Sequence, residues 1–426
     1  MTQTVGAPPQ QSLSELLGLG LLRTSARLLA AHWWQLLAVA TCAYVAHHYL
    51  IELAVRVGRA GAVPGLLVFS LVPLVPLVAI VLMLLVLRER RTGGGGVAAF
   101  VAAIGSVLVP FLVVYESQGD FMDDLGSYFN VGFEDDMATG SDTLARTPEP
   151  TSPLVIAVVG VAFLLRVVGA RAAERESLWR GGRRPLRSTL RALNGYAEVV
   201  WIVLGTVVVV AGLRGLRDWW RDRRLGRALA DWWDGVAVAF PDLGALGDWL
   251  VTAVGRVTDG VVTGLVAPLA WLAIGVIVYG LSAAEGIAET EVVDAVRRTS
   301  GIGRVAQRVD PGVITLAWRR IADPEGRFGA LLGGVAMILR SRFVPVLVFC
   351  VVYTVLTAAL PYAVWEVART VFTRFDYPDW LAAYGPLQAL VHVLLLCLTA
   401  PLLAAWADAL LIRFGARSQL RLPDAG

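Results

Sequence analysis

Lysine is absent from this chain, and charged residues of any kind are scarce. All 37 basic side chains are arginine, 17% of the 426 residues are charged and 57% are apolar, whereas soluble proteins average about 25% charged and about 45–50% apolar residues. This composition excludes an ordinary soluble domain and indicates an integral membrane protein. The net charge of +3 is too small to indicate a nucleic acid partner, and arginine without lysine is typical of a GC-rich bacterial genome.

Cysteine is also rare, and motifs that carry known chemistry are missing. The three cysteines, Cys42, Cys350 and Cys397, lie inside apolar runs, where a free thiol behaves as a small buried hydrophobic side chain. A disulfide framework or cysteine-based metal site is therefore not expected. The sequence contains no convincing phosphate loop, catalytic triad, zinc-protease motif or dinucleotide fingerprint. We expect no cofactor.

Long uncharged runs are what the chain does have. A membrane-spanning helix needs roughly 20 apolar residues, and eight segments approach or exceed that length. Two of them are weaker because a charged residue interrupts each. The six strong runs are Leu28–Ile51, Leu66–Leu87, Val97–Tyr115, Gly260–Ala284, Phe343–Trp365 and Trp380–Ala407, and the two weaker ones are Pro153–Ala170, with Arg166, and Gly195–Leu213, with Glu198.

The distribution of arginine favours eight spans with both termini in the cytoplasm. Arginine is enriched on the cytoplasmic side of span ends, and this topology places most of the 37 there. Without the two weaker spans, the arginine-rich hairpin Arg171–Arg191 would move outside. No cleavable signal peptide is evident. Ser12 and Glu15 form a capping-box pattern that opens an amphipathic helix before the first span.

The predicted protein is all-α, a polytopic helical protein of the cell membrane with about eight transmembrane helices and additional interfacial helices. Its parts are a cytoplasmic amphipathic helix at 1–27, spans one to three at 28–115, an acidic extracytoplasmic loop at 116–152, spans four and five with an arginine-rich cytoplasmic hairpin at 153–213, an extracytoplasmic Trp/Arg region at 214–259, span six at 260–284, a cytoplasmic arginine-rich helical segment at 285–342, spans seven and eight at 343–412, and a cytoplasmic tail at 413–426.

The stretch RDWWRDRRLGRALADWW, residues 217–233, combines arginine with tryptophan. On one continuous helix its tryptophans share an arc opposite the arginines, with Trp220 and Asp222 misplaced. This pattern predicts a helix in the membrane interface, with indoles at headgroup depth and guanidinium groups reaching lipid phosphates. A helix packed on neighbouring loops is the alternative, and nucleic acid binding is disfavoured. The predicted anchors are Trp219, Trp232, Trp233, Arg221 and Arg224.

The connection 116–152 is the most acidic stretch, with Arg146 as its single basic residue. Its carboxylates could supply oxygen ligands to a divalent cation, although their spacing does not fit an EF-hand loop. We expect a solvated acidic loop, with a metal site as the alternative. The candidate ligands are Asp123, Asp124, Asp135 and Asp136.

Ionisable residues within the predicted spans lie at two depths. Charged groups in hydrocarbon are costly, so they mark either a functional pathway or structural polar contacts, and both interpretations stay open. Among them, His48 and Glu52 share a helix face, and Arg166 and Glu198 are expected to form an inner ion pair. The outer candidates are His47, His48, Glu52 and His392, and the inner candidates are Arg166, Glu198 and Asp408.

Prolines inside the strong spans predict kinks, because proline removes a backbone hydrogen bond. Interrupted helices at matching positions of two halves are typical of transporter binding sites, although proline is generally common in membrane helices. Segments 21–88 and 331–413 share a plan that suggests a parallel duplication, which apolar sequences also match by chance. The predicted kinks are at Pro73, Pro76, Pro110, Pro268 and Pro401.

These observations indicate a multi-pass bacterial membrane protein. Because no catalytic motif is recognisable, a function other than catalysis is favoured. The first hypothesis is a transporter or permease-like protein, or a subunit of a membrane complex with protein partners in the bilayer. The alternative is a membrane-embedded enzyme that acts on lipid-linked substrates through the acidic extracytoplasmic metal site.

Overall fold

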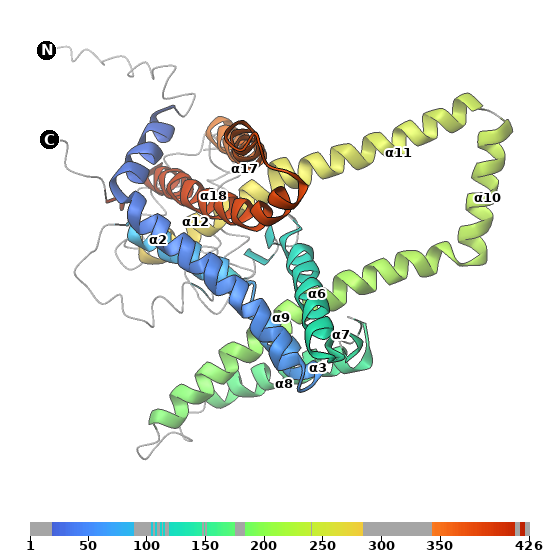
Figure 1. Ribbon diagram of the computed structural model, residues 1–426, viewed down its shortest axis with the longest axis horizontal. Coiled ribbons are helices and arrows are strands. Elements are labelled where there is room, and N and C mark those ends of the chain that lie inside the picture. The colour runs from blue at the N-terminus through green and yellow to red at the C-terminus, as the bar shows by residue number, and fades with distance from the viewer. Residues whose placement is uncertain are drawn as a thin grey trace, which may run out of the picture. The chain divides into compact units, whose positions relative to one another are not determined.

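The structure is a computed structural model. It describes residues 19–88, several residues between 104 and 115, residues 119–146, 149 and 151–174, and residues 184–239, 241–283, 343–413 and 418–421. Within these ranges the backbone is helical apart from turns and one isolated antiparallel bridge. The predicted all-α class is therefore confirmed for the described part of the chain (Figure 1).

The chain divides into two compact units. Unit 1 comprises Met1–Val45, Pro76–Gln118 and Val261–Gly426, and unit 2 comprises Ala46–Val75 and Gly119–Gly260. Helix α2 (Leu19–Gly58) runs through both. Unit 1 otherwise contains most of α4 (Leu74–Val86), a π-helical turn (Val262–Val266), α12 (Ala267–Ala283), α17 (Phe343–Val371) and α18 (Tyr377–Arg413). Unit 2 contains α3 (Ala62–Phe69), α6 (Asp120–Thr139), α7 (Thr143–Arg146), α8 (Pro153–Glu174), α9 (Arg184–Arg221), α10 (Arg224–Ala239) and nearly all of α11 (Pro241–Val261).

Six helical segments within the described residues are long and apolar enough to cross a membrane. They correspond to five of the strong runs and to the weaker run that contains Glu198. The helix Pro153–Gly169 is apolar but shorter, and most of the run Val97–Tyr115 lies outside the described residues, so the count of eight is not confirmed. The six segments are Leu19–Gly58, Ala62–Val86, Leu193–Leu213, Thr252–Tyr279, Val344–Val371 and Tyr377–Ile412.

The predicted proline kinks have different structural outcomes. Pro73 lies in the turn between α3 and α4 and divides the second predicted span into two helices. Pro76 lies in the first turn of α4, where a backbone N–H has no partner within the helix and proline is tolerated. Pro268 lies in α12, which continues the helix of α11 without a break. The π-helical turn Val262–Val266 joins α11 to α12, and a local π adjustment is one way in which a helix accommodates the hydrogen bond that proline removes.

Pro401 lies inside α18, as the sequence predicts. Its carbonyl oxygen accepts a hydrogen bond from the buried Ser25 hydroxyl at 3.2 Å. Two further prolines, Pro361 in α17 and Pro386 in α18, are also interior to their helices and were not among the predicted kinks. Pro110 lies outside the described residues.

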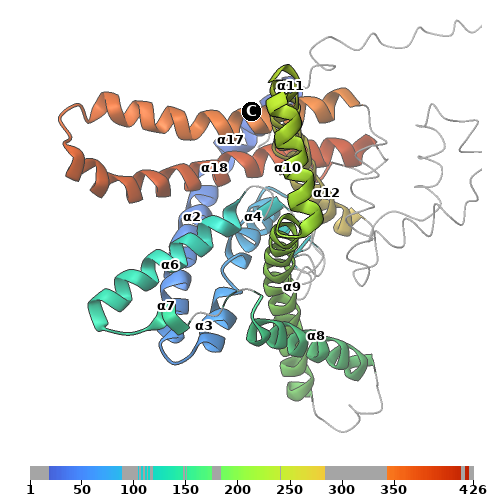
Figure 2. The same cartoon turned by 90° about the vertical axis from the view of Figure 1, so that its right-hand side faces the viewer.

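Unit 1 is built on close contact between α12, α17 and α18, and α17 and α18 form a long antiparallel pair (Figure 2). A Cβ atom on Gly275 would lie 3.2 Å from the Ala407 Cβ, so α12 and α18 approach closely through small residues. The buried Trp406 Nε1 donates a hydrogen bond to the Pro345 carbonyl oxygen at 3.0 Å. Small residues and polar ties of this kind are common between helices that pack in lipid, where hydrophobic burial gives little driving force.

Unit 2 is organised around the antiparallel pair α8 and α9 (Figure 2). Ala162 of α8 packs with Val200 and Leu204 of α9, and Leu67 of α3 borders this cluster. The Tyr196 hydroxyl donates a hydrogen bond to the Leu67 carbonyl oxygen at 2.8 Å. The short helix α3 is thereby fixed to α9 by both apolar contact and a polar tie.

Glycine lets α3 fold back onto the end of α2. A Cβ on Gly65 would lie 2.9 Å from the Gly58 Cα and 3.2 Å from the Ala54 carbonyl oxygen. Both are backbone atoms, which cannot rotate away as a side chain can. This crossing therefore requires glycine at position 65.

We predict that Gly65→Ala destabilises the protein by about 1–3 kcal/mol, the usual effect of overpacking a tight contact. The measurement is the midpoint of thermal unfolding in a mild detergent. Gly160→Ala in α8 is the matched control, because a Cβ there meets nothing within 4 Å and alanine favours a helix. Equal midpoints for the two variants would contradict the close α2–α3 crossing.

Candidate functional site

The acidic connection contains a regular helix, α6, where a solvated loop was expected. Asp120 and Asp123 lie in its first turn, where carboxylates interact favourably with the positive end of the helix dipole. Gly119 and Gly140 adopt left-handed conformations at its two ends, and the Gly140 N–H donates to the Asp136 carbonyl oxygen at 2.8 Å. Left-handed backbone favours glycine, which explains why the helix starts and stops there.

One face of α6 is buried against α3. Phe121, Tyr128 and Gly132 are buried on α6 at helical spacing. The Phe69 ring of α3 lies 6.0 Å from that of Phe121 and 5.2 Å from that of Tyr128, both edge to face, an arrangement that aromatic rings favour. The acidic helix is therefore an amphipathic element with its own apolar contact.

A histidine–carboxylate pair joins α6 to α2. The Nε2 atom of His47 lies 3.0 Å from the Asp124 Oδ1 atom. Asp124 is 6% exposed, and a carboxylate buried to that extent needs a charged or hydrogen-bonding partner. The pair therefore explains how an acidic residue is accommodated on the buried face of α6.

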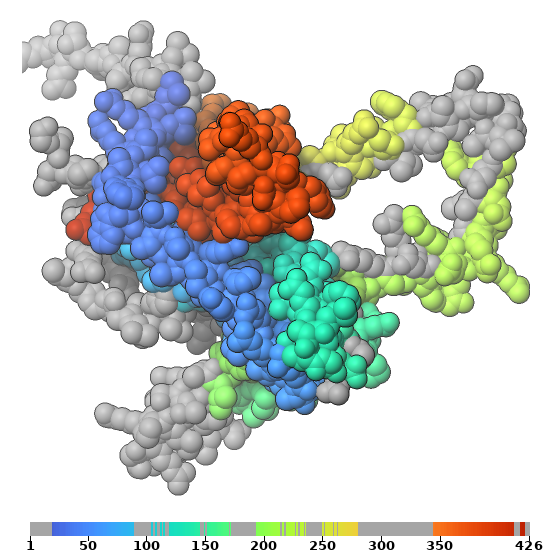
Figure 3. Space-filling view, in the orientation of Figure 1, coloured from blue at the N-terminus to red at the C-terminus, as the bar shows by residue number. Residues whose placement is uncertain are grey.

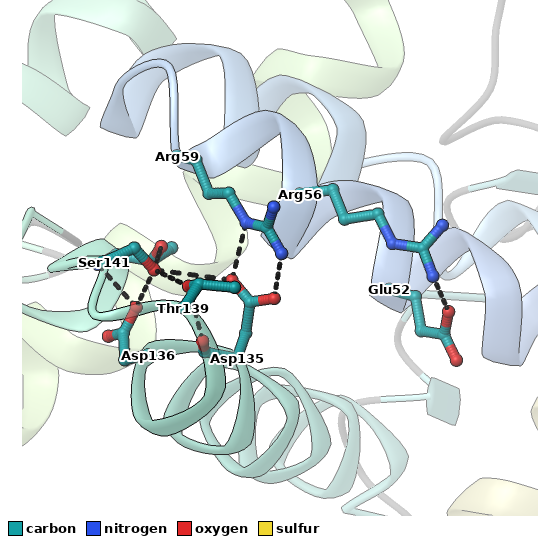
Figure 4. A network of polar contacts seen from close by, with 8 residues as sticks. Glu52, Arg56, Arg59, Asp135, Asp136, Thr139 and Ser141 are labelled. Atoms are coloured by element: carbon teal, nitrogen blue, oxygen red, sulfur yellow. Dashed lines mark hydrogen bonds and ion pairs between the residues drawn. The ribbon is translucent and has the colours of Figure 1, made fainter.

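A second ion pair joins α6 to the residue that follows α2. Arg59 and Asp135 form a bidentate ion pair there (Figure 4). The Arg59 Nε donates to Asp135 Oδ2 at 2.7 Å, and the terminal guanidinium nitrogen donates to Oδ1. The hydrogen bond from Arg59 lowers the pKa of Asp135, and the same contact raises the pKa of Arg59. In the space-filling view α6 lies directly against the end of α2 (Figure 3).

Asp136, the next residue, caps the short helix α7. Its carboxylate accepts hydrogen bonds from the Ser141 hydroxyl at 2.6 Å and from the amides of Thr143 and Leu144 at 2.9 and 3.0 Å (Figure 4). The Leu144 amide and the Ser141 hydroxyl are the main reasons that the pKa of Asp136 is lowered to about 2. Capping the free amides of a first helical turn is an ordinary structural use of aspartate.

These contacts bear on the predicted metal ligands. Asp124, Asp135 and Asp136 each have protein donors within bonding distance, and Asp123 is exposed. Among the residues that the structure describes, no group of three histidine, cysteine or acidic side chains is placed to hold a metal ion. Asp124, Asp135 and Asp136 therefore join α6 to α2 and α7 and act as a structural clasp in this conformation.

The outer polar candidates pair locally. The His48 Nε2 lies 3.4 Å from Glu52 Oε1, and Glu52 also accepts a hydrogen bond from Arg56 at 2.7 Å (Figure 4). His392 belongs to the other unit, where its Nδ1 lies 2.9 Å from the Gln388 carbonyl oxygen of its own helix and its ring is 6.1 Å from that of Tyr44. The structure thus brings His48 and Glu52 together, and His47 takes the separate partner Asp124.

The inner candidates also divide. Arg166 of α8 and Glu198 of α9 form the expected ion pair, with Nε and Oε1 3.6 Å apart and Glu198 buried. Asp408 lies in unit 1 and accepts hydrogen bonds from the Ser418 hydroxyl and the Gln419 amide. The ion pair of Arg166 with Glu198 therefore joins α8 to α9. Asp408 does not take part in it and has its own partners.

The Trp/Arg stretch is not one continuous helix. Helix α9 ends at Arg221 and α10 begins at Arg224, so the single arc predicted across 217–233 is interrupted at Asp222–Arg223. At this break the Arg223 guanidinium carbon lies 4.1 Å from the centroid of the Trp219 ring, a cation–π contact. Arg221 and Arg224 are exposed, as are the predicted anchors Trp219, Trp232 and Trp233, at 49%, 61% and 40%.

Several residues of the clasp were missed by the sequence argument. Arg59 is the partner of Asp135, and Ser141 and Thr143 complete the cap around Asp136. Two signals were available. Arg59 lies eight residues beyond the first predicted span, which ends at Ile51, and the apolar positions Phe121 and Tyr128 recur at helical spacing through the acidic stretch.

Comparison of the chain with protein-family models, with curated proteins and with solved structures gives no match in any of the three.

The Asp136 cap has a defined pH dependence. Because its folded pKa is depressed to about 2 from an unfolded value near 3.9, the stabilisation of α7 is complete above about pH 4 and is lost as the pH falls through about 2. Hydrogen–deuterium exchange of the Thr143 and Leu144 amides measures it. We expect Asp136→Asn to speed their exchange at pH 7, whereas Asp142→Asn, at an exposed neighbour, leaves it unchanged. Equal exchange in both variants would show that Asp136 does not cap α7.

Proposed function

We propose that this chain is a multi-pass protein of the bacterial cell membrane that acts as a subunit of a membrane complex. In the proposed topology the chain starts and ends in the cytoplasm, and α6, α10 and the start of α11 lie on the opposite side. The six long apolar helices support membrane location, and the preference of arginine for the cytoplasmic side supports the orientation.

The main support for a role in a membrane complex is that α9 extends well beyond the end of its apolar segment. The candidate span of α9 ends at Leu213, but the helix continues through Arg221. Eight further residues rise about 12 Å, or about 9 Å at a tilt of 40°. The headgroup region on each side of a bilayer is only about 6 Å thick. Helix α10 therefore begins beyond the headgroups.

The start of α11 lies at a similar distance from its own candidate span. Helix α11 begins at Pro241, and the candidate span that it enters begins at Thr252. The eleven intervening residues rise about 16 Å. Helix α10 lies between α9 and α11 (Figure 1). In this proposal both helices extend from the membrane, and α10 lies beyond the headgroups and not in the lipid interface that the sequence predicts. Trp219 and Trp220 on α9 remain close enough for headgroup contact.

Helix α10 presents a surface that suits a protein partner. Leu225 and Trp232 share one face and are 74% and 61% exposed, and Arg224 and Arg227 are exposed beside it. Tryptophan and arginine are enriched among the residues that contribute most to protein interfaces. An amphipathic helix of this kind binds in an apolar groove, and here we expect a groove rimmed by carboxylates.

The competing functions lack comparable support. The enzyme hypothesis needs free carboxylates for a metal ion, but Asp124, Asp135 and Asp136 are engaged by His47, Arg59 and the start of α7. The transport hypothesis places His48 and His392 in one functional site. Each of these histidines has a local partner, and the two belong to different units.

We predict that Trp232→Ala weakens the association with the partner by about 30-fold or more, the usual effect of truncating a dominant interface residue. The measurement is the mass and polypeptide content of particles extracted directly into polymer nanodiscs, followed by dissociation on dilution. Trp34→Ala is the matched control, because Trp34 is 58% exposed within the candidate span of α2 and faces lipid in our proposal.

Two results would contradict the proposed subunit role. One is a wild-type particle that contains this chain alone as a monomer. The other is a partner that dissociates equally from both tryptophan variants, which would place its binding surface away from α10.

A further inference from the structure

Residues 418–421 fold back on the end of α4. The Arg421 N–H donates a hydrogen bond to the Leu87 carbonyl oxygen at 3.0 Å, and Arg88 and Leu420 form an antiparallel bridge. Within the described residues this is the one β-type contact. It joins parts of the chain that are far apart in sequence, and all of them belong to unit 1.

A buried carboxylate on α18 holds the same segment. Asp408 is 3% exposed, and its two oxygens accept hydrogen bonds from the Ser418 hydroxyl at 2.8 Å and from the Gln419 amide at 2.7 Å. Gln419 is itself 5% exposed. A carboxylate buried in a membrane helix is costly without donors, and this segment supplies two.

Helix α12 joins this end of the unit through Tyr279. Its hydroxyl donates a hydrogen bond to the Leu84 carbonyl oxygen at 3.2 Å, and the side chain is fully buried. One turn earlier on α12, Gly275 contacts Ala407 of α18 closely. The ends of α4, α12 and α18 are therefore held together by side chains as well as by the segment that crosses them.

We propose that residues Ser418–Arg421 form a releasable strap across the ends of α4 and α18, with Asp408 as its latch. The backbone pairing involves too few residues to persist by itself, because even a complete two-stranded hairpin is only marginally stable in water. Closure therefore depends on the two hydrogen bonds to Asp408. Hydrogen bonds to a charged group are stronger than neutral ones, so the strap and the carboxylate stabilise each other.

The strap has two defined states. When it is closed, Asp408 is shielded and α4 is tied to α18 through Leu87. When it opens, the Asp408 carboxylate loses both donors and must be hydrated or take up a proton. The direct tie between α4 and α18 is then lost, while the contacts of α12 with both helices remain. A partner or modification that competes for Ser418 would shift the chain toward the open state. The strap is independent of the surface on α10.

Disulfide trapping tests the closed state directly. In a chain with Cys42, Cys350 and Cys397 replaced by alanine, Arg88→Cys with Leu420→Cys places two thiols on facing residues of the antiparallel bridge. We expect rapid cross-linking in native membranes under mild oxidant. The control pair, Arg88→Cys with Arg421→Cys, differs by one residue and should cross-link far less, because neighbouring side chains of an extended segment point to opposite faces.

The latch is tested by adding Asp408→Ala to the cross-linking pair. We expect the closed state to fall at least about tenfold relative to the open state, the change in an equilibrium constant that loss of one hydrogen bond to a charged group produces. Asp408→Asn, which keeps one acceptor oxygen, should give an intermediate rate. The pair Gly275→Cys with Ala407→Cys reports folding, because these positions approach within disulfide range independently of the strap.

The proposal fails if Arg88→Cys with Leu420→Cys cross-links no faster than the control pair. It also fails if Asp408→Ala leaves that rate unchanged while the Gly275–Ala407 pair still cross-links. If Asp408→Ala also abolishes the Gly275–Ala407 cross-link, Ser418→Ala decides the question: it leaves the carboxylate in place, and an unchanged rate in that variant overturns the latch.

Discussion

Hydrocarbon cannot form hydrogen bonds with a peptide backbone, and the helices of the described residues meet that constraint in the proposed membrane location. Each long apolar run satisfies its own N–H and C=O groups as a helix. Where proline removes a donor, Pro73 lies in a turn, Pro76 lies in a first helical turn and Pro268 follows a π-helical turn. Pro401 lies inside α18. Lipid gives little hydrophobic drive to helix association. The helices are therefore joined by small residues, as at Gly65 and Gly275, and by polar ties to backbone carbonyls from Ser25, Tyr196, Tyr279 and Trp406.

In the described residues, the paired carboxylates serve mainly to join neighbouring helices and segments. Asp124 and Asp135 hold α6 to α2, Asp136 starts α7, and Glu198 ties α9 to α8. In the other unit Asp408 holds the segment that crosses α4. Each carboxylate has donors from the protein itself, so each is more readily explained as part of the architecture than as a catalytic group. The exposed surface of α10 is the feature that internal contacts do not explain.

Sequence reasoning succeeded where one physical rule dominates and failed where several compete. Apolar length predicted the helices around Leu28–Ile51 and Trp380–Ala407, and helix spacing predicted the pairing of His48 with Glu52. The ion pair of Arg166 with Glu198 was predicted because each charge interrupts an apolar run and therefore needs a partner. Helix α6 was missed because its acidic residues masked the periodicity of Phe121 and Tyr128. The break at Asp222–Arg223 and the contact of Arg59 with Asp135 depend on tertiary geometry that no local pattern carries.

The proposed orientation of the helices in the bilayer places both α6 and α10 on the side opposite to the cytoplasm. Single cysteines in a cysteine-free background, probed with a membrane-impermeant maleimide, measure it directly. The exposed positions Ser127 in α6, Leu225 in α10 and Arg171 in α8 are suitable sites. The account predicts that cysteines at 127 and 225 are labelled in intact cells and that a cysteine at 171 is labelled only after permeabilisation. Labelling at 127 that requires permeabilisation would contradict it.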